Sequence, residues 1–146
     1  MKLYVVVSCI TLAVLGVLSA VVVRSLTRAE VCQPGQATRA RRTTARMKRR
    51  VFLRYGLPGG NHTGWCAQGC EIDHLVALEL GGADVVENLW PQPFVGQWTA
   101  RQKDRLENTL HGLVCRGKMS LETAQQLLRQ DWTQAYRHYV DAEQKE

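Results

Sequence analysis

The chain begins with an uncharged apolar run that limits what its first part can become. From Leu3 to Val23 the sequence reads LYVVVSCITLAVLGVLSAVVV and contains no charged side chain. As a helix rising about 1.5 Å per residue, this run would extend about 30 Å, the thickness of one bilayer core. Cleavable signal sequences usually have a shorter apolar stretch of roughly 7–15 residues. We therefore expect residues 1–28 to be a signal peptide or a transmembrane anchor, with the anchor favoured.

Two features disagree about the side of the membrane on which the rest of the chain would lie. Only Lys2 and the amino terminus precede the run, whereas Arg24, Arg28, Arg39, Arg41 and Arg42 follow it. Positive residues usually remain on the cytoplasmic side. An even number of cysteines in a small domain behind an export-type segment instead indicates disulfides in an oxidising compartment. We give the cysteines more weight. We expect a single-pass protein of the cytoplasmic membrane with its domain outside the cytoplasm, or a secreted or periplasmic protein if the segment is cleaved.

The four cysteines beyond the apolar run allow three disulfide pairings. We favour Cys66–Cys70, which would close a local loop, and Cys32–Cys115, which would join an N-terminal arm to a late helix. Two alternatives remain open. The thiols could be free and buried, or Cys66, Cys70 and His74 could bind zinc at their four-residue spacings, with Cys32 or Cys115 as a fourth ligand.

Positive charge is concentrated in one segment of the chain. Residues 24–54 hold ten basic residues and one acidic residue, whereas residues 55–146 hold eight basic and twelve acidic residues. Such a segment is typical of a surface that contacts phosphates or an anionic membrane, and a solvated helix face is the alternative. The residues that we expect to contact nucleic-acid phosphates are Arg41, Arg42, Lys48, Arg49 and, farther along the chain, Arg101.

Local patterns predict a mainly helical domain. Residues 29–42 are expected to be an irregular arm, because Pro34 and Gly35 interrupt any helix. Four helices are expected, each from a capping residue or from apolar residues at helical spacing. They cover about residues 44–55, 100–115, 121 onward and 131–142, with Thr43 or Thr44, Thr99 and Ser120 capping the first three.

One hairpin is expected between these helices. Residues 71–80 and 85–90 are predicted to form its two strands, with a turn at Gly81 and Gly82. Pro91 and Pro93 are expected to end the second strand, because proline lacks the N–H that a strand ladder needs.

The chemistry concentrates in EIDHLVALELGGADVVENLWPQPF, residues 71–94. Here an adjacent Asp73-His74 pair precedes the Gly-Gly turn, Asn88 and Leu89 follow it, and a helix rich in Asp, Glu and His comes next. This stretch resembles the HNH family of His-metal-finger (ββα-metal) endonucleases. The run KDRLENTLHGLVCRGKMSLETAQQLLRQDW resembles a small exported bacterial subgroup of that family, and the resemblance covers about residues 32–138. It implies an α+β fold, with a ββα-metal finger embedded in a mainly helical single domain.

The resemblance implies catalytic roles for three residues. His74 would be the general base that takes a proton from water, since histidine titrates near neutral pH. Asn88, on the facing strand, would hold the imidazole by a hydrogen bond. Lys103 or Arg101 would neutralise phosphate charge.

A divalent cation would complete such a site. Asp73 would offer a hard oxygen ligand suited to magnesium or manganese, with zinc as the alternative. Asp104, Glu107 and His111 lie at i, i+3 and i+7 of the helix, so they share one face and could supply further ligands. Many members of the family place a second Asn or His early in this helix, where this chain has residues 101–104. The two Cys-x-x-Cys pairs of many members are also absent, which favours disulfides.

Together these features predict three parts: residues 1–28 as signal or anchor, 29–56 as a basic arm and helix, and 57–146 as an HNH-like nuclease domain with C-terminal helices. The predicted function is metal-dependent endonuclease activity on nucleic acid, with DNA favoured and RNA possible, and without a small-molecule cofactor. The membrane would be a partner through the N-terminal segment. The alternatives are a non-catalytic nucleic-acid-binding module with a degenerate HNH fold, and a disulfide-stapled envelope protein that binds protein or membrane.

Overall fold

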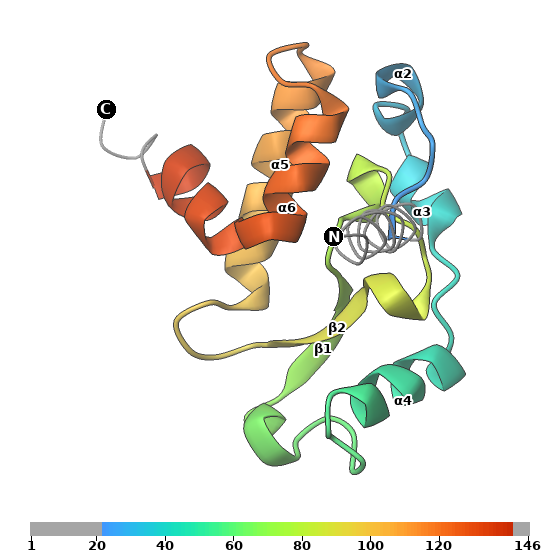
Figure 1. The fold of residues 1–146 in the computed structure, drawn as a ribbon, viewed down its shortest axis with the longest axis vertical. Coiled ribbons are helices and arrows are strands. Elements are labelled where there is room, and N and C mark those ends of the chain that lie inside the picture. Colours follow the sequence, from blue (N-terminus) through green and yellow to red (C-terminus); the bar gives the residue numbers. More distant parts are fainter. Residues whose placement is uncertain (1–21, 142–146) are drawn as a thin grey trace, which may run out of the picture.

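The computed structural model describes residues 22–141 (Figure 1). Helices and a two-stranded antiparallel sheet make up this part, which confirms the predicted α+β class. Residues 1–21 of the predicted signal or anchor lie outside the described residues, and no helix among residues 22–141 is long and apolar enough to cross a membrane. The first described residues already pair with the turn of the hairpin. The Arg24 amide donates to the Gly81 carbonyl over 2.7 Å, and the Ala83 amide donates to the Val22 carbonyl over 2.9 Å.

The arm is helical rather than irregular, which corrects the prediction for residues 29–42. Helix α2 covers Arg28–Val31, and helix α3 covers Gln36–Ala40. The Thr27 hydroxyl accepts the Glu30 amide, and the Glu30 carboxylate accepts the Thr27 amide, so a capping box starts α2. Pro34 and Gly35 lie between the two helices. They therefore separate helices instead of preventing them.

Helix α4 covers Ala45–Arg54 and confirms the predicted helix after Thr44. The Thr44 hydroxyl accepts the Met47 amide and caps it. The buried face of α4 carries Val51, which packs with Leu89 and Val86 of the hairpin region in a small apolar cluster. This contact holds the basic helix against the sheet (Figure 1).

The hairpin is shorter than predicted. Strand β1 covers Cys70–His74 and strand β2 covers Leu89–Pro93, with Cys70 opposite Pro93 and His74 opposite Leu89. The long connection contains two 3₁₀ turns, Leu78–Leu80 and Val86–Asn88. Pro91 and Pro93 lie inside β2 instead of ending it. In a sheet of two strands both are edge strands, and proline is tolerated where its nitrogen faces away from the partner strand.

Two long helices complete the domain. Helix α5 covers Ala100–Cys115, as predicted, and helix α6 covers Leu121–Tyr136. The helix expected to begin at Asp131 is continuous with α6, which bends there because Asp131 has non-helical φ and ψ of −159° and 88°. Its carboxylate caps the second half by accepting the Thr133 and Gln134 amides. A π-helix, Arg137–Asp141, follows.

The main core lies between α5 and α6, which run side by side in Figure 1. Leu106, Leu110 and Leu128 are buried there, together with Val76 and Leu80 from the hairpin connection. The segment that follows His74 is therefore fixed against the first long helix. This packing brings the predicted site residues of β1 and α5 together.

Candidate functional site

A histidine–aspartate pair lies at the end of strand β1. His74 is 2% exposed, and its Nε2 lies 3.0 Å from Oδ1 of Asp84. Asp84 also accepts the Thr43 hydroxyl over 2.7 Å and the Arg42 backbone amide. The basic arm thus fixes the carboxylate that faces the imidazole. No described residue hydrogen-bonds to Nδ1 of His74.

Electrostatics define the protonation of this pair. Burial opposes ionisation of Asp84, but the hydrogen bonds from Thr43, Arg42 and His74 outweigh it and lower the Asp84 pKa. Burial lowers the pKa of His74, although its hydrogen bond to Asp84 and the nearby Asp73 act in the opposite direction. A neutral imidazole that donates Nε2–H to ionised Asp84 keeps a lone pair on Nδ1.

Asn88 does not hold the imidazole, which corrects the role predicted for it. Its side chain is fully buried, accepts the Val76 amide over 3.0 Å, and donates to the carbonyls of Val76 and Ala83 over 3.0 and 2.9 Å. These bonds close the connection between the strands around the His74–Asp84 pair. Asn88 is therefore a positioning residue for the backbone.

Steric contacts explain why two glycines occupy the turn at residues 81 and 82. A Cβ on Gly82 would lie 1.8 Å from the Val76 carbonyl oxygen, and Gly81 has a positive φ of 79°. Only glycine accommodates both a backbone contact this close and a left-handed turn next to it. The turn lets residue 76 and residues 82–83 approach each other closely enough for Asn88 to bridge them.

Lys103 is a buried ion-pair centre, which corrects its predicted role as a phosphate ligand. Its side chain is fully buried, and Nζ donates to Asp73 Oδ2 over 2.9 Å, to the His74 carbonyl over 2.6 Å, and to Glu107. Burial opposes its charge, but Glu107 and Asp73 outweigh this effect and raise the Lys103 pKa. An ammonium group has three N–H bonds, so none remains for a phosphate.

A polar pocket of about 270 Å³ opens beside the His74–Asp84 pair. Its lining brings together residues of the arm, strand β1, the hairpin connection and α5. The polar members of this lining are Arg41, Asp73, His74, Glu79, Asp104, Glu107 and Asn108.

The carboxyl groups of this pocket have raised pKa values. Burial raises the pKa of Glu107 to about 8, although Lys103 acts against it. Burial also raises the pKa of Glu79 and of Asp104, with the charge of Asp73 adding to the effect at Asp104. The shifts of Glu79 and Asp104 favour the protonated forms of these two groups, whereas Glu107 is paired with the Lys103 ammonium. Several groups with shifted pKa values inside one pocket are typical of functional sites.

The other predicted phosphate ligands lie in different places. Lys48 and Arg49 are exposed on α4, and Arg101 is exposed at the start of α5. Arg41 alone of the predicted set lines the pocket, and Arg42 contributes its backbone amide to Asp84. The sequence motif did not single out Asp84 or Glu79. Asp84 could have been noticed as the only acid directly after the Gly-Gly-Ala turn, whereas nothing local marks Glu79.

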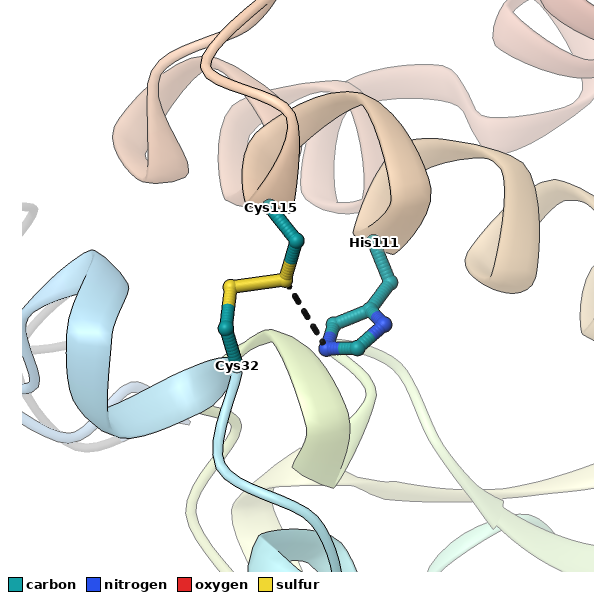
Figure 2. Close-up of side chains that lie close together, drawn as sticks. All are labelled: Cys32, His111 and Cys115. Atoms are coloured by element: carbon teal, nitrogen blue, oxygen red, sulfur yellow. Dashed lines mark hydrogen bonds between the residues drawn. A yellow bond between two sulfur atoms is a disulfide. The ribbon is translucent and has the colours of Figure 1, made fainter.

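Both favoured disulfides, Cys32–Cys115 and Cys66–Cys70, are present. This confirms the pairing and removes the open alternatives of free thiols and of zinc bound to Cys66 and Cys70. Among residues 22–141, Cys32, His111 and Cys115 are the only three His, Cys, Asp or Glu residues whose ligand atoms lie close enough to share a metal ion (Figure 2). The disulfide occupies both sulfurs, and His111 Nε2 lies 3.2 Å from the Val31 carbonyl and 3.5 Å from Cys115 Sγ. His111 therefore lies beside this disulfide and does not form the predicted metal-ligand group with Asp104 and Glu107.

No family model, no curated protein and no solved structure matches this chain.

Proposed function

We propose that this domain hydrolyses phosphodiester bonds in nucleic acid, with His74 as the general base. The observation that carries the proposal is the His74–Asp84 pair at the wall of a polar pocket that Arg41 also lines. The order β1, β2, α5 around this pair supports it as well, because it is the order that the resemblance to HNH endonucleases implies.

The proposed reaction begins with a water molecule beside Nδ1 of His74. Asp84 holds Nε2–H, so the imidazole presents its Nδ1 lone pair, accepts a proton from the water, and leaves hydroxide to attack phosphorus. The lowered pKa of His74 keeps the imidazole unprotonated at neutral pH. Arg41 is the cation in the pocket lining that a phosphate would meet, and arginine suits phosphate geometry.

A proton donor for the leaving oxygen is present in the same pocket. Glu79 is half-buried and its pKa is raised by burial, so it holds a proton to higher pH than an ordinary glutamate. A base with a lowered pKa and an acid with a raised pKa in one site are a pattern that acid–base enzymes use. Glu79 is therefore our candidate general acid.

The predicted magnesium or manganese site does not fit the arrangement of Asp73, Asp104 and Glu107. Asp73 and Glu107 both bind the Lys103 ammonium, and Asp104 is exposed on α5. Their oxygens are not among the described groups close enough to share one ion. The reaction that we propose therefore has no step that needs a metal ion.

A non-catalytic nucleic-acid-binding module is the second candidate. It is favoured by one observation, the filling of the predicted metal position by Lys103. In that case exposed Lys48 and Arg49 would bind phosphates, and Asp84 would only connect the arm to His74.

Plasmid nicking by the full chain in detergent tests the proposal, in magnesium, in manganese and in EDTA. His74→Ala should lower cleavage by about 10²–10⁴-fold, the usual contribution of general-base catalysis. His138→Ala is the matched control, because His138 is exposed on the C-terminal π-helix. Asp84→Asn should lower the rate and move the acid limb of the pH profile to lower pH, because Asp84 raises the pKa of His74. A folded wild type that cleaves neither DNA nor RNA under any of these conditions would refute the proposal.

We also propose that the domain lies outside the cytoplasm. The two disulfides support this location, because disulfides persist mainly in oxidising compartments. Alkylation of protein taken directly from its host, followed by mass measurement, should find four of the five cysteines protected until reductant is added. Four alkylated cysteines beyond the apolar run without reductant would favour the cytoplasmic side.

A further inference from the structure

We propose that the Lys103 ammonium is the resident cation of this site and takes the place, between Asp73 and Glu107, that a divalent metal ion would occupy. The wild-type domain then binds no magnesium or manganese between these carboxylates. This inference rests on the geometry of Lys103. Only its consequence for catalysis rests on the proposed function.

The surroundings of Nζ are those of a small hard cation. Two carboxylate oxygens and one main-chain carbonyl oxygen surround it, from Asp73, Glu107 and His74. Carboxylate and carbonyl oxygens are the ligands that magnesium, manganese and calcium take in proteins. Here each oxygen instead accepts one of the three N–H bonds of an ammonium group. The set is complete without a metal ion.

Residues of helix α5 and of strand β1 together hold the ammonium group in this position. Lys103 and Glu107 lie at i and i+4 of α5, on one face of the helix, and both are buried. Asp73 and the His74 carbonyl come from the end of β1, so the ammonium joins the strand to the helix. The Lys103 side chain is 0% exposed, so an ion that entered between these carboxylates would meet a buried positive charge.

This arrangement also accounts for the place of His74. The ammonium binds the backbone carbonyl of the residue whose imidazole faces Asp84. Lys103 is therefore a positioning residue for His74 rather than a ligand of the substrate. If the domain cleaves nucleic acid as proposed above, cleavage should persist in EDTA, because no step then needs a divalent ion.

Manganese binding to the purified full chain tests the inference directly, with free Mn²⁺ measured by electron paramagnetic resonance. The wild type should show no site tighter than about 1 mM. Lys103→Met, which keeps an apolar stem of similar length and removes the charge, should bind Mn²⁺ at least tenfold tighter than the wild type. That binding should disappear in the double variant Lys103→Met/Asp73→Asn. Lys118→Met is the control, because Lys118 is exposed, and it should behave as the wild type does.

Thermal unfolding gives a second readout. Mn²⁺ should raise the melting temperature of Lys103→Met and leave that of the wild type unchanged, because a ligand stabilises only the state that binds it. If Lys103→Met does not fold, the wild type and Asp73→Asn decide the question by themselves. Submillimolar Mn²⁺ binding by the wild type that is lost in Asp73→Asn would overturn the inference, as would a folded Lys103→Met that binds no Mn²⁺. Wild-type protein without cleavage in any condition would refute the proposed function alone, since the manganese titration does not depend on activity.

Discussion

Removal of the Cys32–Cys115 disulfide should destabilise the domain far more than removal of Cys66–Cys70. The first bridge joins residues 83 apart in sequence, and the second joins residues 4 apart. A bridge stabilises the fold by restricting the unfolded chain, and the loop-entropy relation gives about 4.6 kcal/mol for the long loop and about 1.9 kcal/mol for the short one. We therefore expect the double replacements Cys32→Ala/Cys115→Ala and Cys66→Ala/Cys70→Ala to differ by about 2.7 kcal/mol in free energy of unfolding.

Packing acts against this difference without reversing it. Cys66 and Cys70 are 1% and 2% exposed, whereas Cys32 and Cys115 are only half-buried. Replacement by alanine therefore costs more packing at the short bridge, by about 1 kcal/mol at most for the sulfurs lost. Both members of each pair are replaced together, so that neither partner is left as a free thiol that could form a new disulfide.

Urea unfolding of the oxidised full chain, followed by tryptophan fluorescence, measures this difference. Trp132 lies in the main core and reports on its exposure. With a denaturant slope of about 2 kcal/mol per molar, the midpoint should fall by about 2.3 M for the long-loop variant and, with the packing cost included, by about 1 to 1.5 M for the short-loop variant. Equal losses, or a larger loss at Cys66–Cys70, would refute the loop-entropy reasoning.

Three further predictions concern single residues. Asn88→Ala should lower the free energy of unfolding by at least about 3 kcal/mol, because it leaves three buried backbone groups unpaired, and an unchanged urea midpoint would contradict this. Burial raises the pKa of Glu79, so this group contributes stability that is full below its ordinary pKa of 4.5 and is lost as pH rises through its folded pKa. Urea midpoints of Glu79→Gln should lack this decline, and parallel pH profiles would argue against it. Arg41→Gln should weaken nucleic-acid binding for all sequences alike and reduce the salt slope by about 1, whereas Lys118→Gln should change neither; filter binding at several salt concentrations measures both.

The helices were the part of the fold that local sequence could predict. Thr44 and Ser120 each cap a helix through a hydrogen bond that spans three residues, so the signal is complete within a short segment. The same holds for Thr99 and Gln102 at the start of α5. The arm was mispredicted because Pro34 and Gly35 mark a break between helices as readily as the absence of helices.

The hairpin was harder to predict because its ends depend on distant contacts. Strand β1 stops at His74, where the backbone leaves the ladder and is held by Asn88, Gly82 and the arm. The motif identified His74, Asn88 and Lys103 as special residues. It could not show that Asp84 would bind the imidazole while Asn88 binds backbone, because both lie in the same connection and only the folded geometry separates their roles.

Lys103 illustrates a further limit of sequence reasoning. A lysine four residues before a glutamate on a helix is usually an exposed pair of small energetic value. Here packing of α5 against β1 buries both and adds Asp73 as a third member. The spacing of Lys103 and Glu107 along the helix does not show that both are buried. Sequence alone therefore could not identify this pair as part of the site.

The pairing of residues 22–24 with the hairpin turn limits the freedom of a tethered domain. The apolar run ends at Val23, and Val22 and Arg24 are already hydrogen-bonded to Ala83 and Gly81. Residues 3–21 alone would still reach about 28 Å as a helix, enough for a bilayer core. If this run anchors the domain in a membrane, no free linker separates the run from the hairpin turn. The domain would then lie against the lipid headgroups and could move little relative to the membrane surface.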